Sequence, residues 1–353
     1  MRIFEAGLQK LPAFCAVRED VRAGRLPTAV TGLGHIHKVL WIHALHTALN
    51  RRTVLLVADE AEATRMQEDL TALGENVLLL PARELSLRQL ESASREYEQQ
   101  RLGTLANMAE GRYDCVIAGL DAAVQYTLPP ETLLSRTLDI VAGAPLPVPD
   151  IAAALIAAGY ERAAQIEGAG QFAIRGGIVD IYPAAATQPI RVELWGDTVD
   201  TIAYFDLLSQ RRTETLDAVS IPPAAEIMYD DAAGLAEKLT ALCARLRGKN
   251  AALQKENLQK DIDRLQSGSL PTSLDKYIPL IYEKPATFFD YCRDSLMFVS
   301  EIGRVRERAR TFHWQLQEDI KGLIGEGVLC HALTEFAMPS DTLHLRLEQM
   351  GAV

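Results

Sequence analysis

The chain has 353 residues, of which 48% are hydrophobic and 24% charged, as in an ordinary globular protein long enough for two or three domains. Its formal net charge of −11, from 47 acidic against 36 basic residues, argues against a protein whose main work is binding nucleic-acid phosphates. No apolar run reaches membrane-spanning length, the N-terminus lacks a signal-peptide core, and the five cysteines are scattered without paired spacing, so we expect a cytoplasmic protein with reduced thiols.

Short apolar segments alternate with helical patterns over residues 1–120. The predicted strands are 28–32, 53–58, 76–81 and 114–118, and the predicted helices are 36–49, 60–73 and 85–110. Such alternation is typical of a parallel sheet covered by helices on both faces. The expected class is therefore an α/β domain of the nucleotide-binding or helicase-like kind.

The turn after the first predicted strand is the place where such a domain would bind nucleotide. A P-loop there needs the pattern Gly-x-x-x-x-Gly-Lys-Ser/Thr, whose lysine reaches the terminal phosphates and whose hydroxyl holds magnesium. When the pattern is aligned on Gly34, Ala29 replaces the first glycine. His35 then replaces the lysine, and Ile36 replaces the hydroxyl residue.

A second alignment of the same turn starts from Lys38. Gly32 then survives as the first glycine, but His37 replaces the second glycine and Val39 the hydroxyl residue. In either register an aliphatic side chain stands where the magnesium ligand is needed. We therefore expect a degenerate nucleotide site that holds no ATP and needs no cofactor.

An acidic pair and a histidine cluster in this region are interpreted as structural and not as functional. Asp59-Glu60 imitates the acidic pair of an ATPase, but Asp59 directly precedes a helix and is a preferred N-cap there. Four histidines cluster over residues 35–46, at positions 35, 37, 43 and 46. A metal site is conceivable, but no carboxylate or thiolate partner is near in sequence, so we expect an ordinary helix surface and no metal.

Residues 170–205 predict a small antiparallel meander. Two runs of β-branched and aromatic residues flank a polar loop, and a third follows the turn at 195–198. Apolar and polar residues alternate over 190–195, so one face is buried and the other available. Gly176-Gly177 predicts a bulge or kink that turns Arg175 outward.

The remaining sequence returns to helix. Leucines at helical spacing over 233–266 predict a long amphipathic hairpin or a pair of helices. Residues 296–299 predict a strand, and 343–347 a short strand-like segment after a linker at 339–341.

The meander carries a family resemblance. Arg175-Gly-Gly-Ile-Val-Asp-Ile-Tyr-Pro183, followed by Ile190-Arg-Val-Glu-Leu194, resembles the second domain of the bacterial transcription-repair coupling factors, which also occurs in the excision-repair helicase subunit UvrB. The resemblance implies a docking module for the damage-recognition ATPase UvrA. The docking arginines of that module, one after a Gly-Tyr pair and one before a glycine, match Arg162 and Arg175. A further arginine of UvrB is Ala173 here.

Three more residues are candidates for this partner surface. They are Phe172, Tyr182 and Arg191. Arginine suits such work because its planar fork pairs with carboxylates and often dominates interface energetics. For the two aromatic residues, burial in the domain core is the preferred interpretation.

The same resemblance implies that the ATPase site is dismantled. The acidic pair that UvrB has after the strand at 296–299 is Ser300-Glu301 here, so the magnesium-side carboxylate is a hydroxyl. UvrB also inserts an aromatic hairpin that clamps DNA at about residues 85–102, where this chain has Tyr97 as its one aromatic residue. Both differences predict a loss of hydrolysis and of DNA clamping.

The expected organisation is a helicase-like parallel sheet interrupted by a small α+β docking domain. Residues 1–120 and 209–353 would form the degenerate helicase-like parts, the latter with the helical hairpin, and 121–208 the UvrA-docking domain. The expected function is a non-catalytic, UvrA-recruiting adaptor region, a fragment of a longer factor whose absent regions bind RNA polymerase and double-stranded DNA. The alternatives are an ATP-dependent UvrB-like helicase subunit and a direct DNA-binding protein.

Overall fold

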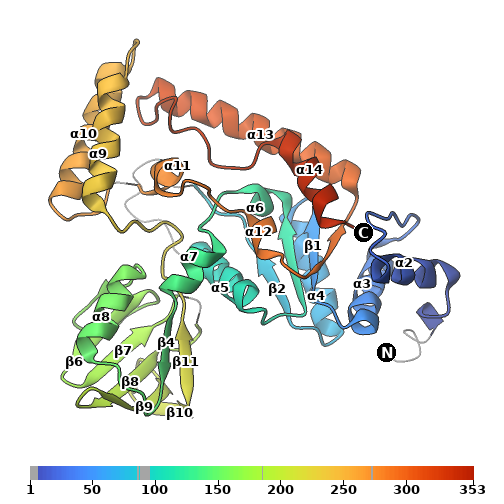
Figure 1. Cartoon of the computed structure of the whole chain (residues 1–353), viewed down its shortest axis with the longest axis horizontal. Helices are drawn as coiled ribbons and strands as arrows, with labels where there is room; N and C mark the ends of the chain where they lie inside the picture. The colour runs from blue at the N-terminus through green and yellow to red at the C-terminus, as the bar shows by residue number, and fades with distance from the viewer. Residues whose placement is uncertain (1–6, 86, 88–95, 185, 272) are drawn as a thin grey trace. The chain divides into compact units, whose positions relative to one another are not determined.

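The structure is a computed structural model that describes residues 7–85, 87, 96–184, 186–271 and 273–353. Its internal contacts divide the chain into two compact units (Figure 1). The parallel-sheet unit comprises Met1–Glu84, Glu110–Tyr126 and Ala286–Val353, and the antiparallel-sheet unit comprises Leu85–Ala109 and Thr127–Pro285. The chain therefore leaves the first unit and returns to it, while the domain limits expected at 120 and 208 remain predictions.

The parallel-sheet unit is built on four strands in the order β12-β1-β3-β2. They are β12 (Leu296–Val299), β1 (Thr53–Val57), β3 (Cys115–Gly119) and β2 (Val77–Leu80), and every pair is parallel. The predicted parallel sheet is confirmed, with a strand from near residue 300 at its edge.

Helices cover both faces of this sheet, as the short apolar strands predicted. Leu55 and Val57 belong to the core shared with α2 (Pro12–Arg22), α3 (His35–Leu49) and α4 (Glu60–Ala72). The alternate residues Val54 and Leu56 are equally buried and face the opposite way, where α6 (Leu120–Val124) contacts β1 and β3. The helices α12 (Phe288–Tyr291) and α13 (Ile302–Gly325) contact α6 in turn.

Residues 28–32 do not form the predicted strand. The edge of β12 that such a strand would need is occupied by the last residue, because Val353 N donates to Met297 O and Val299 N donates to Val353 O. The 28–32 segment runs outside this pairing, with the Thr28 amide donating to the Ala352 carbonyl. It belongs to no strand and bends at Gly32, whose φ is 82°.

The strand-like segment predicted at 343–347 is also wrong, since it lies inside helix α14 (Ser340–Met350). Leu343 and Leu347, four residues apart, are buried on one helix face, whereas Leu345 is exposed. Three leucines at alternate positions imitate a strand, but only two of them are buried.

The antiparallel-sheet unit contains the predicted meander within a six-stranded sheet of order β10-β9-β8-β7-β6-β5. The strands are β5 (Glu161–Arg162), β6 (Gln171–Arg175), β7 (Ile178–Tyr182), β8 (Ile190–Trp195), β9 (Thr198–Phe205) and β10 (Arg212–Leu216). One face packs against α8 (Val148–Ala157) through a core that includes Phe172, Val179 and Val192. A smaller pair, β4 (Leu138–Val141) with β11 (Ala218–Ile221), completes the unit's sheets.

Gly176 and Gly177 form a two-residue hairpin turn between β6 and β7, not the predicted bulge. Arg175 pairs directly with Ile178, Gly176 has a left-handed φ of 62°, and a Cβ on Gly177 would lie 2.8 Å from the Leu194 carbonyl oxygen. The turn therefore needs glycine at position 176 because of the left-handed backbone conformation, and at position 177 because a side chain would clash with the Leu194 carbonyl. The register shift expected here occurs one strand further on, between Glu193 and Leu194.

The predicted helical hairpin is present as α9 (Ala232–Arg245) and α10 (Ala251–Gln266), which pack against each other. The other helices of this unit are α7 (Pro130–Arg136), the short turns at Asp275–Tyr277 and Ile278–Ile281, and most of α5 (Glu96–Glu110). The predicted start of the helix at 85–110 includes residues 86 and 88–95, which lie outside the described residues. Among the described helices, none combines the length and apolar character that crossing a membrane requires.

Candidate functional site

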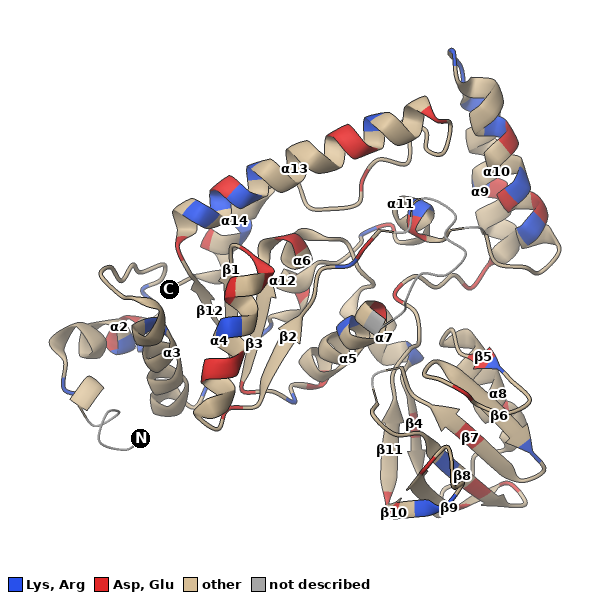
Figure 2. Cartoon of the chain, turned by 180° about the vertical axis from the view of Figure 1, so that it is seen from behind, with Lys and Arg blue, Asp and Glu red and all other residues tan. Residues whose placement is uncertain are grey.

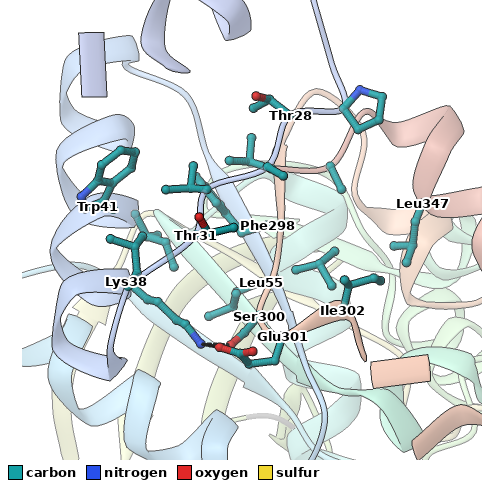
Figure 3. A pocket seen from close by; sticks show the side chains of 18 of the residues that line it. Thr28, Thr31, Lys38, Trp41, Leu55, Phe298, Ser300, Glu301, Ile302 and Leu347 are labelled. Carbon is teal, nitrogen blue, oxygen red and sulfur yellow. Dashed lines mark hydrogen bonds and ion pairs between the residues drawn. The ribbon is translucent and has the colours of Figure 1, made fainter. Parts of the chain in front are cut away.

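A pocket lies at the carboxyl ends of β1 and β12, where an α/β domain of this type would bind nucleotide. Its volume is about 520 Å³. Figure 3 shows aliphatic and aromatic side chains on its walls and one polar group of residues at its edge. The labelled lining residues are Thr28, Thr31, Lys38, Trp41, Leu55, Phe298, Ser300, Glu301, Ile302 and Leu347.

The polar edge of this pocket is closed by Lys38. Its Nζ donates to Ser300 Oγ at 3.1 Å and lies 2.5 Å from Glu301 Oε1 (Figure 3). The hydrogen bond and the charge of Lys38 hold the pKa of the Glu301 carboxyl below its usual value. The lysine ammonium is therefore neutralised by a carboxylate of its own chain.

A second basic residue, Arg304, pairs with two carboxylates, one of which accepts a hydrogen bond from Ser300. Ser300 Oγ donates to Glu62 Oε1 at 2.7 Å, and Arg304 bonds Glu62 Oε2 at 3.2 Å and Asp59 Oδ2 at 3.0 Å. Asp59 also caps α4 by accepting the Glu62 amide at 2.9 Å, which confirms the predicted N-cap. These contacts form one connected network with the Lys38–Glu301 pair through Ser300.

The residues predicted for the nucleotide site divide into two groups. Ala29, Gly32, Ser300 and Glu301 line the pocket, and Lys38 lines it with them. The other three lie elsewhere. Gly34 is the N-cap of α3, His35 bonds Asp69 Oδ2 at 2.7 Å, and Ile36 is exposed. Of the two alignments of the turn, the one based on Lys38 matches the geometry.

The second candidate region is the available face and edge of the antiparallel sheet. Arg162 lies on the two-residue edge strand β5 and is exposed, and Arg175 ends β6 with 48% of its side chain exposed. Arg162 is the parallel pairing partner of Phe172. Its side chain therefore leaves the backbone on the same side of the sheet as the side chain of Phe172. Arg175, three residues beyond Phe172, starts on the opposite side.

Arg191 is held inside the unit by Asp180, a residue that the sequence did not single out. Asp180 is buried and accepts from Arg191 Nε at 2.6 Å and from Arg191 Nη2 at 2.9 Å. This pairing raises the pKa of Arg191, whose guanidinium also lies 4.3 Å from the centre of the Phe205 ring. Arg175 Nη2 reaches the same carboxylate at 2.5 Å. Arg191 therefore positions Asp180, and Asp180 helps to position Arg175.

The two aromatic candidates differ in exposure. Phe172 is fully buried in the core, as its preferred interpretation predicted, and Tyr182 is half-buried with its hydroxyl donating to Thr187 O at 3.4 Å. Two large apolar residues that were not named as docking candidates are far more exposed, although Trp195 lies on the face that the alternation over residues 190–195 leaves available. Trp195 is 85% exposed and Leu208 is 95% exposed. A large apolar side chain in a polar turn is the signal that would have identified them.

The expectation that the histidine cluster lacks an acidic partner is wrong. His43 is buried, not on an ordinary helix surface, and its Nδ1 lies 2.5 Å from Glu75 Oε1. His46 Nε2 lies 3.3 Å from Glu75 Oε2 and 3.8 Å from Asp114 Oδ1. These partners come from the turns before β2 and β3, so only the assembled sheet brings them to α3.

Comparisons with known proteins agree with the architecture. Residues 138–227 match the family model of the UvrB interaction domain, and this range includes all six strands of the antiparallel sheet and the β4–β11 pair. The chain is 33% identical over 329 residues to the transcription-repair-coupling factor of Bacillus subtilis (strain 168), covering 90% of this chain and 28% of the relative. It is 24% identical over 313 residues to the factor of Staphylococcus aureus (strain MRSA252), covering 86% of this chain and 27% of the relative. Residues 138–227 thus match a UvrB interaction domain, and they lie within a region that is similar to about a quarter of the length of these factors.

Proposed function

We propose that this chain is a UvrA-recruiting adaptor region of a transcription-repair coupling factor, on the premise that residues 138–227 are a UvrB interaction domain. In this proposal the antiparallel-sheet unit presents the partner surface, and the parallel-sheet unit is a scaffold without ATPase activity. The observation that carries the proposal is that the matched domain displays Arg162 and Arg175 at its surface.

The local chemistry supports a protein partner for this surface. Arg175 is half-exposed yet oriented by the buried Asp180, so part of its conformational entropy is already lost before binding. Exposed arginines and aromatic residues are the side chains that most often dominate interface energetics. By their register, the side chains of Arg162 and Arg175 leave the backbone on opposite sides of the sheet. UvrA would therefore wrap around the β5–β6 edge rather than lie on one face.

The Lys38–Glu301 pair supports the non-catalytic part of the proposal. An ATPase uses its lysine on the terminal phosphates and a carboxylate on magnesium. Here the lysine is 2.5 Å from a glutamate, and a serine that donates to Glu62 replaces the expected aspartate. Basic and acidic bands also alternate along α13, where Arg308 pairs with Asp121, instead of forming a basic stripe for DNA (Figure 2).

The test is a calorimetric titration of the chain into purified UvrA. We expect 1:1 binding per docking surface, and at least a tenfold loss of affinity for Arg175→Ala, equal to about 1.4 kcal/mol. Arg162→Ala is measured separately, because an edge-wrapping partner would contact both arginines. Circular dichroism and thermal unfolding check that each variant stays folded.

The matched control is Arg22→Ala combined with Arg65→Ala, which removes two exposed arginines from the parallel-sheet unit. This control should bind UvrA as tightly as the unmodified chain. Binding that survives both docking substitutions would keep the adaptor function and move its site. Absence of any binding to UvrA would refute the adaptor function.

A further inference from the structure

We propose that His46, Glu75 and Asp114 form a binding site for one divalent cation of the zinc class, at the amino ends of the parallel strands. His46 lies in the last turn of α3, while Glu75 and Asp114 stand in the turns that lead into β2 and β3. The site thus lies at the amino ends of the strands, whereas the pocket that Lys38 closes lies at their carboxyl ends.

The three potential ligand atoms converge. His46 Nε2 is 3.3 Å from Glu75 Oε2 and 3.8 Å from Asp114 Oδ1, and one atom from each residue lies within 4.8 Å of the other two. Zinc bound tetrahedrally to imidazole nitrogen and carboxylate oxygen at about 2.0–2.2 Å requires ligand atoms about 3.3–3.6 Å apart. The two distances from His46 are close to this value before any adjustment by a bound ion.

The hydrogen bond of His46 Nδ1 is compatible with metal binding through Nε2. This Nδ1 lies 2.8 Å from the carbonyl oxygen of Arg51, and because a carbonyl only accepts, Nδ1 must carry the proton. In the neutral ring, Nε2 therefore presents its lone pair toward two carboxylates. Lone pairs that face one another in this way are stabilised by a cation placed between them.

Each of the two carboxylates is also held by its other oxygen. Glu75 Oε1 accepts from His43 Nδ1 at 2.5 Å, and Asp114 Oδ2 accepts from the backbone amide of Asn76 at 2.8 Å. Metal ligands in proteins are usually oriented by such outer hydrogen bonds, which leave one atom of each group aimed at the ion. All three ligands here have that support.

The three ligands range from buried to exposed, so an ion would be held by a buried carboxylate and could enter from the solvent side. The Glu75 side chain is 6% exposed and His46 is 20% exposed, whereas Asp114 is 42% exposed at the solvent side. Three protein ligands leave a fourth zinc position for water. A bound ion would tie the end of α3 to the turns before β2 and β3, and so stabilise this edge of the sheet.

The test uses the whole chain, stripped with a chelator and titrated with ZnCl2 by calorimetry. We expect one equivalent of Zn²⁺ to bind and to raise the melting temperature, since a ligand that binds only the folded state stabilises it. Replacement by Co²⁺ should produce the strong visible absorption of a tetrahedral site. His46→Ala and Asp114→Asn should each weaken Zn²⁺ binding at least tenfold.

The matched control is His331→Ala, which removes an exposed histidine from another part of the unit. It should bind Zn²⁺ as the unmodified chain does. The proposal is overturned if the unmodified chain binds no stoichiometric Zn²⁺, or if Asp114→Asn and His46→Ala both bind it unchanged. If His46→Ala does not fold, the more exposed Asp114→Asn decides the outcome alone.

Discussion

The ammonium group of Lys38 lies 2.5 Å from a carboxylate oxygen of Glu301, so the lysine that best matches a phosphate-binding residue already has an anionic partner. A triphosphate entering this pocket would have to displace that carboxylate and would find an alcohol, Ser300, in place of the magnesium-side aspartate. Binding energy is lost in both steps.

We therefore expect ATP to bind this chain with a Kd above about 1 mM, corresponding to less than about 4.1 kcal/mol of binding free energy. Equilibrium binding of a fluorescent ATP analogue with magnesium, competed with unlabelled ATP, measures this directly. Lys38→Ala should leave the weak signal unchanged. Saturable micromolar binding that Lys38→Ala removes would instead support the UvrB-like ATPase alternative.

The Lys38–Glu301 pair should contribute a small, acid-sensitive part of stability. Because the folded pKa of Glu301 is lowered, its contribution is present above the unfolded pKa of about 4.3 and is lost as the pH falls through the folded value. The Glu301 side chain is 51% exposed, so solvent screening keeps the effect under about 1 kcal/mol.

Chemical denaturation of Glu301→Gln between pH 3 and pH 7 tests this contribution. The variant should be slightly less stable than the unmodified chain near pH 7, and the difference should vanish at the acid end. Glu237→Gln, an exposed substitution on α9, serves as the control. A difference between Glu301→Gln and the unmodified chain that grows toward low pH would contradict the assignment.

Asp180→Asn should destabilise the antiparallel-sheet unit by about 2–3 kcal/mol, because it removes the charge partner of Arg191 from a buried position. Thermal unfolding measures the loss. Arg175→Ala removes a half-exposed partner of the same carboxylate and should cost less than about 1 kcal/mol. Equal costs for the two substitutions would mean that Arg191 does not depend on Asp180 in solution.

The buried pair of Arg101 and Glu226 predicts a larger effect. Both side chains are fully buried, Arg101 Nε lies 2.8 Å from Glu226 Oε1, and Thr127 Oγ1 donates to Glu226 Oε2 at 2.7 Å. Arg101→Met should cost about 3–5 kcal/mol, since it removes a cation that lies 2.8 Å from a buried carboxylate. The double variant Arg101→Met with Glu226→Leu should regain much of this loss. A double variant as unstable as the single one would show that packing, not the charge, is responsible.

The buried cysteines should resist thiol reagents in the folded chain. Burial raises the pKa of the Cys115 thiol to about 12 and that of Cys292 well above its usual value, so little thiolate forms near neutral pH. Cys15 and Cys243 are partly exposed and should react first. Reaction with a chromogenic disulfide at pH 8, read by mass spectrometry of peptides, assigns each site. Fast labelling of Cys115 without unfolding would contradict its burial.

Much of the fold could be predicted from local patterns. The strands at 53–57, 77–80, 115–119 and 296–299 were each found, because an apolar run of strand length reports burial on both faces. The segments at 28–32 and 343–347 carried similar signals and are not strands. At residues 28–32, the place beside β12 is taken by Val353. At residues 343–347, the two buried leucines are four residues apart, which is helical spacing.

The candidate sites divide in the same way. The loss of a magnesium ligand is visible in the sequence, since no alignment of the turn supplies a hydroxyl residue. The sequence does not show that Lys38, and not His35, is the basic residue of the pocket. That depends on which side chain faces Ser300 and Glu301 from across the pocket. Asp180 was missed because burial of a carboxylate does not follow from residue type, whereas the exposure of Trp195 agrees with its place on the available face of residues 190–195.

The sequence by itself determined the alternation of helices and strands, the antiparallel meander and the absence of an intact P-loop, because each depends on residues close together in the chain. The hairpin turn at Gly176-Gly177, expected as a bulge or kink, became visible only in the pairing of β6 with β7. Only the tertiary structure decided that Lys38 pairs with Glu301, that Asp180 holds Arg191, and that His46 meets Glu75 and Asp114. These contacts join segments far apart in the chain. Their geometry depends on strand register and helix packing, which local periodicity does not encode.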